Sequence, residues 1–161
     1  MKIENHRFDN VNFEATPNQS GEMRPEYVII HYTATQGKAG VVNAFKTPSC
    51  KVSAHLVIGI DGDITQMVPF NRIAWHAGAS QWAGKSGCNG FTIGIELVNP
   101  GPLLKTSNGY TDVYGRRYNG DAIEASHKSG LVRQWKYWAG YPTEQLEAVE
   151  AVCTCLFETY P

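Results

Sequence analysis

The sequence predicts an α/β fold in which a mixed central β-sheet is flanked by helices, and three observations lead to this prediction. Short apolar segments of strand length recur through the first 100 residues. Their centres are apolar on both faces, which is typical of a sheet covered on both sides. A segment near the C-terminus instead carries apolar residues at helical spacing. With 161 residues, 42% of them hydrophobic, we expect one packed domain over residues 1–161.

Four segments are predicted to be strands. The first, "YVIIHY" (27–32), is rich in the β-branched and aromatic side chains that suit a pleated surface. The second and third, "AHLVIGI" (54–60) and "DITQMVP" (63–69), are separated by Asp61-Gly62, a turn pair that favours a tight hairpin. The fourth is "FTIGIELVN" (91–99), which is again apolar at its centre.

The clearest predicted helix follows Pro142. Thr143 is suited to cap it, and Glu144 lies in the first turn, where an acidic side chain is favourable. Helical spacing predicts an apolar face made by Leu146, Val149, Val152, Cys153, Leu156, Phe157 and Tyr160. We also expect a short helix around residues 41–45.

The connection over residues 100–141 is long for a compact domain and is rich in glycine and aromatic residues. Such a segment is commonly a functional loop or an insertion with small elements of its own. It is equally compatible with a solvated excursion held by its own tyrosines. The sequence leaves both interpretations open.

Charge and hydropathy exclude two classes of partner. With 14 Lys and Arg against 15 Asp and Glu, the net charge is −1, so we expect no nucleic-acid partner and no membrane partner. No apolar run approaches the roughly 18 residues that span a bilayer. The polar N-terminus has no signal-peptide character, so a cytoplasmic location is expected. Export by a route without a signal peptide would leave the same pattern, and the sequence does not indicate the oligomeric state.

The four cysteines show neither a C-x-x-C pair nor zinc-finger spacing, so reduced thiols are expected: Cys50, Cys88, Cys153 and Cys155.

Two residues stand out as candidates for chemistry. His31 follows a buried strand at the point where it runs into a loop. Glu96 lies between Ile95 and Leu97 in an otherwise apolar run, and glutamate is seldom buried unless it is paired or functional. Burial disfavours the charged carboxylate and suits general acid–base work. A structural ion pair or hydrogen bond within the sheet is the equally weighted alternative.

The segment "VSAHLVIGIDGDITQMVPFNRIAWHAGASQWAGKSGCNGFTIGIELVN" resembles the zinc-dependent N-acetylmuramoyl-L-alanine amidases, the AmpD-like and peptidoglycan-recognition-protein superfamily. The resemblance runs from about residue 27 to residue 99 and resumes in "PTEQLEAVEAVCTCLFETYP". It implies a mixed sheet with a zinc ion at one end. It also implies hydrolysis of the amide between N-acetylmuramic acid and L-alanine, with peptidoglycan or muropeptides as the substrate.

Residue by residue, the resemblance makes His31 the first zinc ligand and Glu96 the catalytic glutamate, which takes a proton from water and later protonates the leaving amine. His55 matches a position that is not a ligand, so a structural role is implied. Beside the substrate groove, the resemblance implies contacts from Trp75, His76, Ala77 and Asn99.

The family pattern places the remaining zinc ligands beyond the long helix, in a "GH" segment and at a later Asp or Cys. We therefore expect this chain to be C-terminally incomplete relative to the family and its Zn2+ site to be incomplete. His127 is the only flexible candidate for a substitute ligand. The prediction is an amidase, and the alternative is a catalytically incomplete module that binds peptidoglycan or muropeptides. An unrelated metal-free protein is a third and weaker interpretation. Whether the substrate is intact wall or a soluble anhydro-muropeptide stays open.

Overall fold

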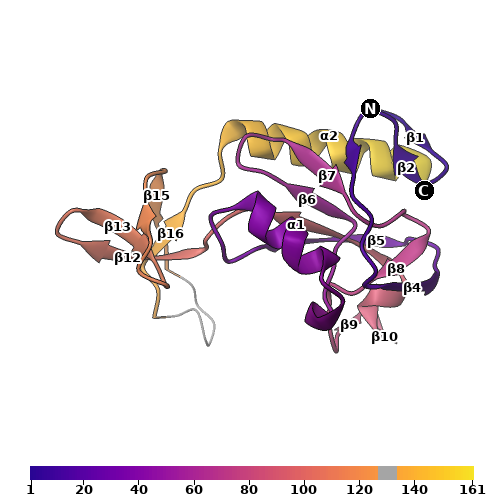
Figure 1. The fold of residues 1–161 in the computed structure, drawn as a ribbon, viewed down its shortest axis with the longest axis horizontal. Helices are drawn as coiled ribbons and strands as arrows, with labels where there is room; N and C mark the ends of the chain where they lie inside the picture. The colour runs from indigo at the N-terminus through magenta and orange to yellow at the C-terminus, as the bar shows by residue number, and fades with distance from the viewer. Residues whose placement is uncertain (127–133) are drawn as a thin grey trace.

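The computed structural model describes residues 1–126 and 134–161 and has the predicted α/β architecture. A main sheet lies between helices α1 and α2, and a second sheet projects from one end of this body (Figure 1). His127, the predicted substitute ligand, lies outside the described residues.

The main sheet is mixed, with strand order β3–β7–β6–β11–β5. β11 pairs in parallel with both β5 and β6, β6 and β7 form an antiparallel hairpin, and β3 pairs in parallel with β7. The bounds are Asn12–Phe13 (β3), Tyr27–Tyr32 (β5), Leu56–Ile58 (β6), Ile64–Gln66 (β7) and Thr92–Leu97 (β11). All four predicted strands are present. β5 has the predicted bounds, and the other three are shorter because their ends leave the ladder and enter loops.

The β6–β7 hairpin has a loop one residue longer than the predicted two-residue turn. The Gly59 N–H donates to the Asp63 carbonyl at 2.8 Å, which leaves residues 60–62 in the loop. Gly62 has a φ of 76°, in the left-handed region that glycine adopts without steric cost. A Cβ at Gly62 would also lie 2.6 Å from the carbonyl oxygen of Glu144. The turn therefore requires glycine for its conformation and for its close approach to α2.

Helices α1 (Lys38–Lys46) and α2 (Thr143–Thr159) lie on opposite sides of the main sheet (Figure 1). On the α1 side, the core consists of Val41, Val42, Phe45, Ala54, Val57, Met67 and Val98. On the α2 side, it consists of Phe8, Leu56, Ile58, Phe70, Ile93, Ile95, Leu97, Val152 and Leu156. Coverage on both sides explains why the central strands lack apolar–polar alternation.

Two details of the predicted C-terminal helix are wrong. Pro142 occupies the N-cap position, and there is no side-chain capping hydrogen bond, so Thr143 begins the helix instead of capping it. Leu146 and Phe157 are 50% and 62% exposed, although spacing placed them on the apolar face. The helix is rotated so that Val152 and Leu156 face the sheet.

The buried face of α2 also contains a polar residue that spacing did not predict. Gln145 is fully buried, and its Nε2 donates to the carbonyl oxygens of Ile58 and Val98, both at 3.1 Å. These carbonyls belong to the ends of β6 and the segment after β11. The start of α2 is thereby bonded to the backbone at the ends of two neighbouring strands.

Smaller elements complete the body. Strands β1 (Ile3–Glu4) and β2 (Arg7–Phe8) form an N-terminal hairpin, and β4 (Gln19–Glu22) pairs with β8 (Arg72–Ala74). The remaining elements are β9 (Gln81–Trp82), β10 (Lys85–Ser86) and two 3₁₀ helices, Pro48–Cys50 and Cys88–Gly90. All four cysteines are free thiols. In the part of the chain that the structure describes, no helix is long and apolar enough to cross a membrane.

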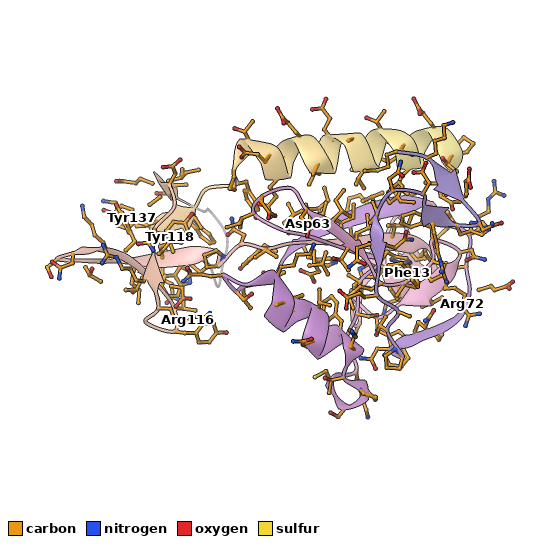
Figure 2. The ribbon with its side chains drawn as sticks, turned by 45° about the horizontal axis from the view of Figure 1, so that its top comes forward. Phe13, Asp63, Arg72, Arg116, Tyr118 and Tyr137 are labelled. Atoms are coloured by element: carbon orange, nitrogen blue, oxygen red, sulfur yellow. The ribbon has the colours of Figure 1, made fainter. Side chains whose placement is uncertain are left out.

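The second sheet is formed within the long connection and is antiparallel throughout, with order β14–β13–β12–β16–β15. Its strands are Pro102–Thr106 (β12), Gly109–Asp112 (β13), Arg117–Tyr118 (β14), Ala122–Glu124 (β15) and Tyr137–Ala139 (β16). Figure 2 shows Arg116, Tyr118 and Tyr137 on this sheet, well apart from Phe13 and Arg72 on the body. The connection is therefore not an unstructured excursion.

Candidate active site

His31 and Glu96 are brought together by the pairing of β5 with β11. They are register partners in this parallel pair, one residue before the end of each strand. Ile95 and Leu97 pack in the core under α2, so the alternating Glu96 points to the opposite face, on the side of α1. His31 shares that face because register partners in a sheet point the same way. The two predicted residues therefore meet at the edge of the main sheet.

Glu96 is a partly buried carboxylate without a hydrogen-bonding partner. Its Oε2 atom is buried and unbonded among the described residues. Burial raises the pKa of Glu96 from 4.5 to about 7, because desolvation disfavours the charged form. The described residues supply no ion pair or hydrogen bond that would make Glu96 a structural anchor of the sheet. Near neutral pH this group can both accept and return a proton.

His76 lies directly against His31, from the loop that follows β8. Its Nδ1 is 3.0 Å from the Nε2 of His31, and its Nε2 is 3.3 Å from the carbonyl oxygen of Thr92. The ring sits on Gly94, where a Cβ would collide with the imidazole. The backbone N–H groups of His76 and Ala77 both donate to Asn89 Oδ1, at 3.0 and 2.8 Å. His76 is thus held from both its ring and its backbone.

Both imidazoles are less basic than an exposed histidine. Burial, with a smaller contribution from the nearby His31, lowers the pKa of His76 to about 4. Burial also lowers the pKa of His31. The site therefore holds two neutral rings beside one titrating carboxylate near pH 7.

His55 is fully buried and has both ring nitrogens bonded. Its Nδ1 accepts from the Gly94 N–H at 3.0 Å, and its Nε2 donates to the Arg72 carbonyl at 2.9 Å. Burial lowers the pKa of His55 to about 3. These contacts fit the structural role expected for His55, which ties β11 to β8 beneath His76.

The other predicted substrate contacts occupy different surroundings. Trp75 donates its indole N–H to Ser20 Oγ at 3.2 Å, so this end of the ring is turned to β4. Asn99 is 2% exposed, and its Nδ2 donates to the carbonyls of Ala139 and Gly140 at 3.3 and 3.1 Å. Its Oδ1 accepts from the Gly101 N–H at 2.7 Å. Asn99 therefore joins the two sides of the base of the second sheet and has little surface to offer a substrate.

Sequence reasoning missed the supports of His76. Asn89 and Thr92 bond to it, and Gly94 leaves room for its ring. A glycine inside an apolar strand is a signal of close approach by another group, so Gly94 was recognisable in principle. Nothing in the sequence pattern distinguishes Asn89 from an ordinary loop residue.

The described residues fit the predicted zinc only in part. Among residues 1–126 and 134–161, no group of three or more His, Cys, Asp and Glu side chains is placed to hold a metal ion. Catalytic zinc needs three protein ligands, and among the described residues only His31 is predicted to be one.

A large open hollow, about 1000 Å³, lies away from these residues. It is bounded by the N-terminal hairpin, β8 and the end of α2, and its lining includes His6, Arg7, Phe13, Arg72 and Tyr160. Figure 2 shows Phe13 and Arg72 on this part of the body. The hollow contains neither His31 nor Glu96, so its size does not mark the site of chemistry.

The geometry at the β5–β11 edge agrees with an independent match in sequence. A family model described as N-acetylmuramoyl-L-alanine amidase matches residues 21–161, which is all but the first 20 residues. The chain belongs to the N-acetylmuramoyl-L-alanine amidase family. The α/β fold described above is that of a member of this family.

Individual relatives match over parts of their length. The 1,6-anhydro-N-acetylmuramyl-L-alanine amidase AmpD of Escherichia coli K12 is 52% identical over 60 residues, covering 37% of this chain and 33% of AmpD. A solved selenomethionine derivative of AmpD superposes with a TM-score of 0.69 at 23% identity, over 100% of this chain and 81% of that one. The E. coli amidase AmiD was solved with anhydro-N-acetylmuramic acid-L-Ala-D-γ-Glu-L-Lys. It superposes with a TM-score of 0.57 at 25% identity, over 91% of this chain and 46% of that one. By aligned residues, the chain spans about a third of the curated relatives it matches.

Proposed function

We propose that this chain carries the catalytic glutamate of an N-acetylmuramoyl-L-alanine amidase, which hydrolyses the amide between N-acetylmuramic acid and L-alanine. The observation that carries the proposal is the unpartnered Glu96 carboxylate beside His31, with a pKa of about 7. A buried carboxylate without a partner is costly to the fold, and such groups cluster at functional sites.

The proposed chemistry follows from the state of Glu96. As a carboxylate, it takes a proton from a water molecule whose oxygen attacks the amide carbonyl. The C–N bond then breaks, and Glu96 returns the proton to the departing amine, so that a carboxylic acid and an amine result. His31 is the one predicted zinc ligand among the described residues, and Zn2+ in the whole protein stays a prediction from the family.

The proposed substrate is peptidoglycan or a muropeptide derived from it. AmiD was solved with a muropeptide, and AmpD is named for the anhydro form of the same linkage. Trp75, His76 and Ala77 remain the proposed substrate contacts, whereas Asn99 is proposed to position the base of the second sheet. A cytoplasmic location is retained as a proposal.

A second candidate function is binding of muropeptides without turnover. It is favoured by the lack of a three-ligand metal cluster among the described residues. The two functions share a substrate and differ in whether the amide is cleaved.

One experiment separates them. The purified chain is incubated with muropeptides in the presence of Zn2+; released stem peptide is followed by mass spectrometry, binding by calorimetry, and bound metal by elemental analysis. Release that is lost in Glu96→Gln establishes the amidase. Binding that is equal in both forms, without release, establishes the binding module. If the chain shows no binding and no release, both proposals are overturned.

A further inference from the structure

The side chains of His31, His76 and Thr92 form a continuous line of hydrogen bonds. The bonds made by Thr92 determine which atom donates in each of the others. The Thr92 hydroxyl donates its single hydrogen to the Cys88 carbonyl oxygen at 2.8 Å. The same hydroxyl lies 3.2 Å from His76 Nε2, and the Thr92 carbonyl oxygen lies 3.3 Å from it. A carbonyl oxygen only accepts, and the hydroxyl hydrogen is already used. Both Thr92 atoms therefore require a hydrogen on His76 Nε2.

The constraint passes from His76 to His31. A neutral imidazole carries one ring hydrogen, so a hydrogen on Nε2 of His76 leaves its Nδ1 as a bare acceptor. His31 Nε2, 3.0 Å away, must then be the donor. This leaves His31 Nδ1 without a hydrogen.

His31 Nδ1 is open to the surroundings. It makes no hydrogen bond within the described part of the chain. The buried side-chain atoms without a partner there are Glu96 Oε2 and Gln145 Oε1, so His31 Nδ1 is unbonded but not buried. It therefore reaches solvent-accessible space on the face that it shares with Glu96. A bare imidazole nitrogen is both a metal ligand and a hydrogen-bond acceptor.

We propose that His76 is a positioning residue, which holds His31 as the Nε2–H tautomer and presents the His31 Nδ1 lone pair at the site. The tautomer is a property of this chain and does not depend on the proposed amidase activity. It deepens the proposed function by naming Nδ1 as the atom of His31 that would bind a metal or accept a hydrogen bond. Partners of this kind orient a metal-binding imidazole by occupying its other nitrogen.

The supports of His76 explain why the arrangement is rigid. Gly94 allows the ring to lie on β11, and Asn89 Oδ1 holds the backbone of its loop at two successive N–H groups. His76 can therefore accept from His31 without searching among rotamers. A structural histidine that merely filled space would not need its Nδ1 aimed at His31.

The test is tautomer measurement by NMR on the ¹⁵N-labelled, metal-free chain at pH 8, above the ordinary histidine pKa of about 6.5. We expect His31 to show a protonated Nε2 and a bare Nδ1, with a scalar coupling across the hydrogen bond from His31 Nε2 to His76 Nδ1. In His76→Phe, which keeps a ring over Gly94, this coupling is lost and the His31 tautomers mix. In His76→Asn, the side-chain oxygen restores an acceptor and the single tautomer.

His6→Phe is the matched control, because the His6 ring bonds to Tyr160 and, among the described residues, has no bond to His31 or His76. This substitution should leave the His31 signals unchanged. A hydrogen on His31 Nδ1 in the native chain, or unchanged His31 signals in a folded His76→Phe variant, would overturn the proposal. If His76→Phe does not fold, the coupling in the native chain decides alone. None of these signals depends on turnover, so their failure is separable from failure of the proposed amidase activity.

Discussion

In the described part of the chain, the main sheet and the second sheet each have five strands, but they are stabilised in different ways. The main sheet is mixed and lies between α1 and α2, with Leu56 and Ile95 fully buried. The second sheet is antiparallel, and Leu104 and Ile123 on it are 45% and 52% exposed. Both candidate catalytic groups belong to the main sheet. Glu96 lies on the buried strand β11, whereas His31 lies on the edge strand β5, where Ile30 is 49% exposed.

Polar contacts link the second sheet to the body. Asp112 is fully buried and accepts hydrogen bonds from Gln36 Nε2 at 2.9 Å and from Arg116 Nε at 2.7 Å. Gln36 belongs to the loop after His31, and Asn99 joins the sheet's base from the other side. The main sheet is thus enclosed by two apolar cores, and these hydrogen bonds join the second sheet to it.

The largest expected effect is on turnover. Glu96→Gln removes the proton acceptor on the main sheet and should lower amide hydrolysis by about 10²–10⁴-fold with the fold retained. Glu124→Gln on the second sheet alters an exposed carboxylate that pairs with Lys136, and it should leave the rate within about twofold. Initial rates of stem-peptide release measure both. Equal losses in the two variants would contradict the assignment of Glu96.

The next effect is on global stability. Leu56→Ala opens a cavity in the covered core and should lower the free energy of unfolding by about 2–5 kcal/mol. Leu104→Ala removes a side chain that is 45% exposed on the second sheet, and it should cost less than about 1 kcal/mol. Denaturant unfolding followed by circular dichroism compares the two variants. Similar costs would show that the second sheet is as tightly packed as the first.

A smaller effect is expected in the pH dependence of stability. The pKa of Glu96 is raised from 4.5 to about 7, so the folded state binds its proton more tightly than the unfolded state does. This contribution is fully present below about pH 4.5 and is lost as the pH rises through about 7. Because Glu96 remains partly solvated, the native chain should lose about 1–3 kcal/mol relative to Glu96→Gln over this range.

His76 contributes with the opposite sign. Its pKa is depressed to about 4, so its stabilisation is lost as the pH falls from about 6.5 to about 4. This contribution is shared by the native chain and Glu96→Gln, so it cancels in their difference. Urea unfolding from pH 4.5 to 8 measures that difference, and a flat profile would show that Glu96 is not desolvated.

The smallest effect should be local to the second sheet. Asp112→Asn removes the charge that holds Gln36 and Arg116, and amide protection in β12 and β13 should fall by about 10–100-fold. Protection in β6 and β11 should not change. Asp63→Asn, at the exposed β6–β7 hairpin (Figure 2), is the control and should leave both sheets as they are. Hydrogen exchange measured by NMR resolves the two sheets, and equal loss in both would show one cooperative unit.

Much of the body was predictable because its signals are local. The apolar runs that form β5, β6, β7 and β11 follow from neighbouring residues, as does the existence of α2. The odd position of Glu96 in such a run was visible for the same reason. The direction in which α2 faces the sheet was not visible, because Leu146 and Phe157 satisfy helical spacing equally well yet remain exposed.

By itself, the sequence determined the strands, the main helix and the placement of His31 and Glu96 near strand ends. Only the tertiary structure decided that β5 and β11 are neighbours in register, that His76 lies 3.0 Å from His31 across 45 residues of chain, and that Asn99 faces the base of the second sheet. The physical reason is that periodicity reports which side of an element is buried, whereas the partner on that side depends on packing between segments distant in the chain. The direction of the hydrogen bond between His31 and His76 depends on Thr92 and Cys88, and no local pattern connects those four residues.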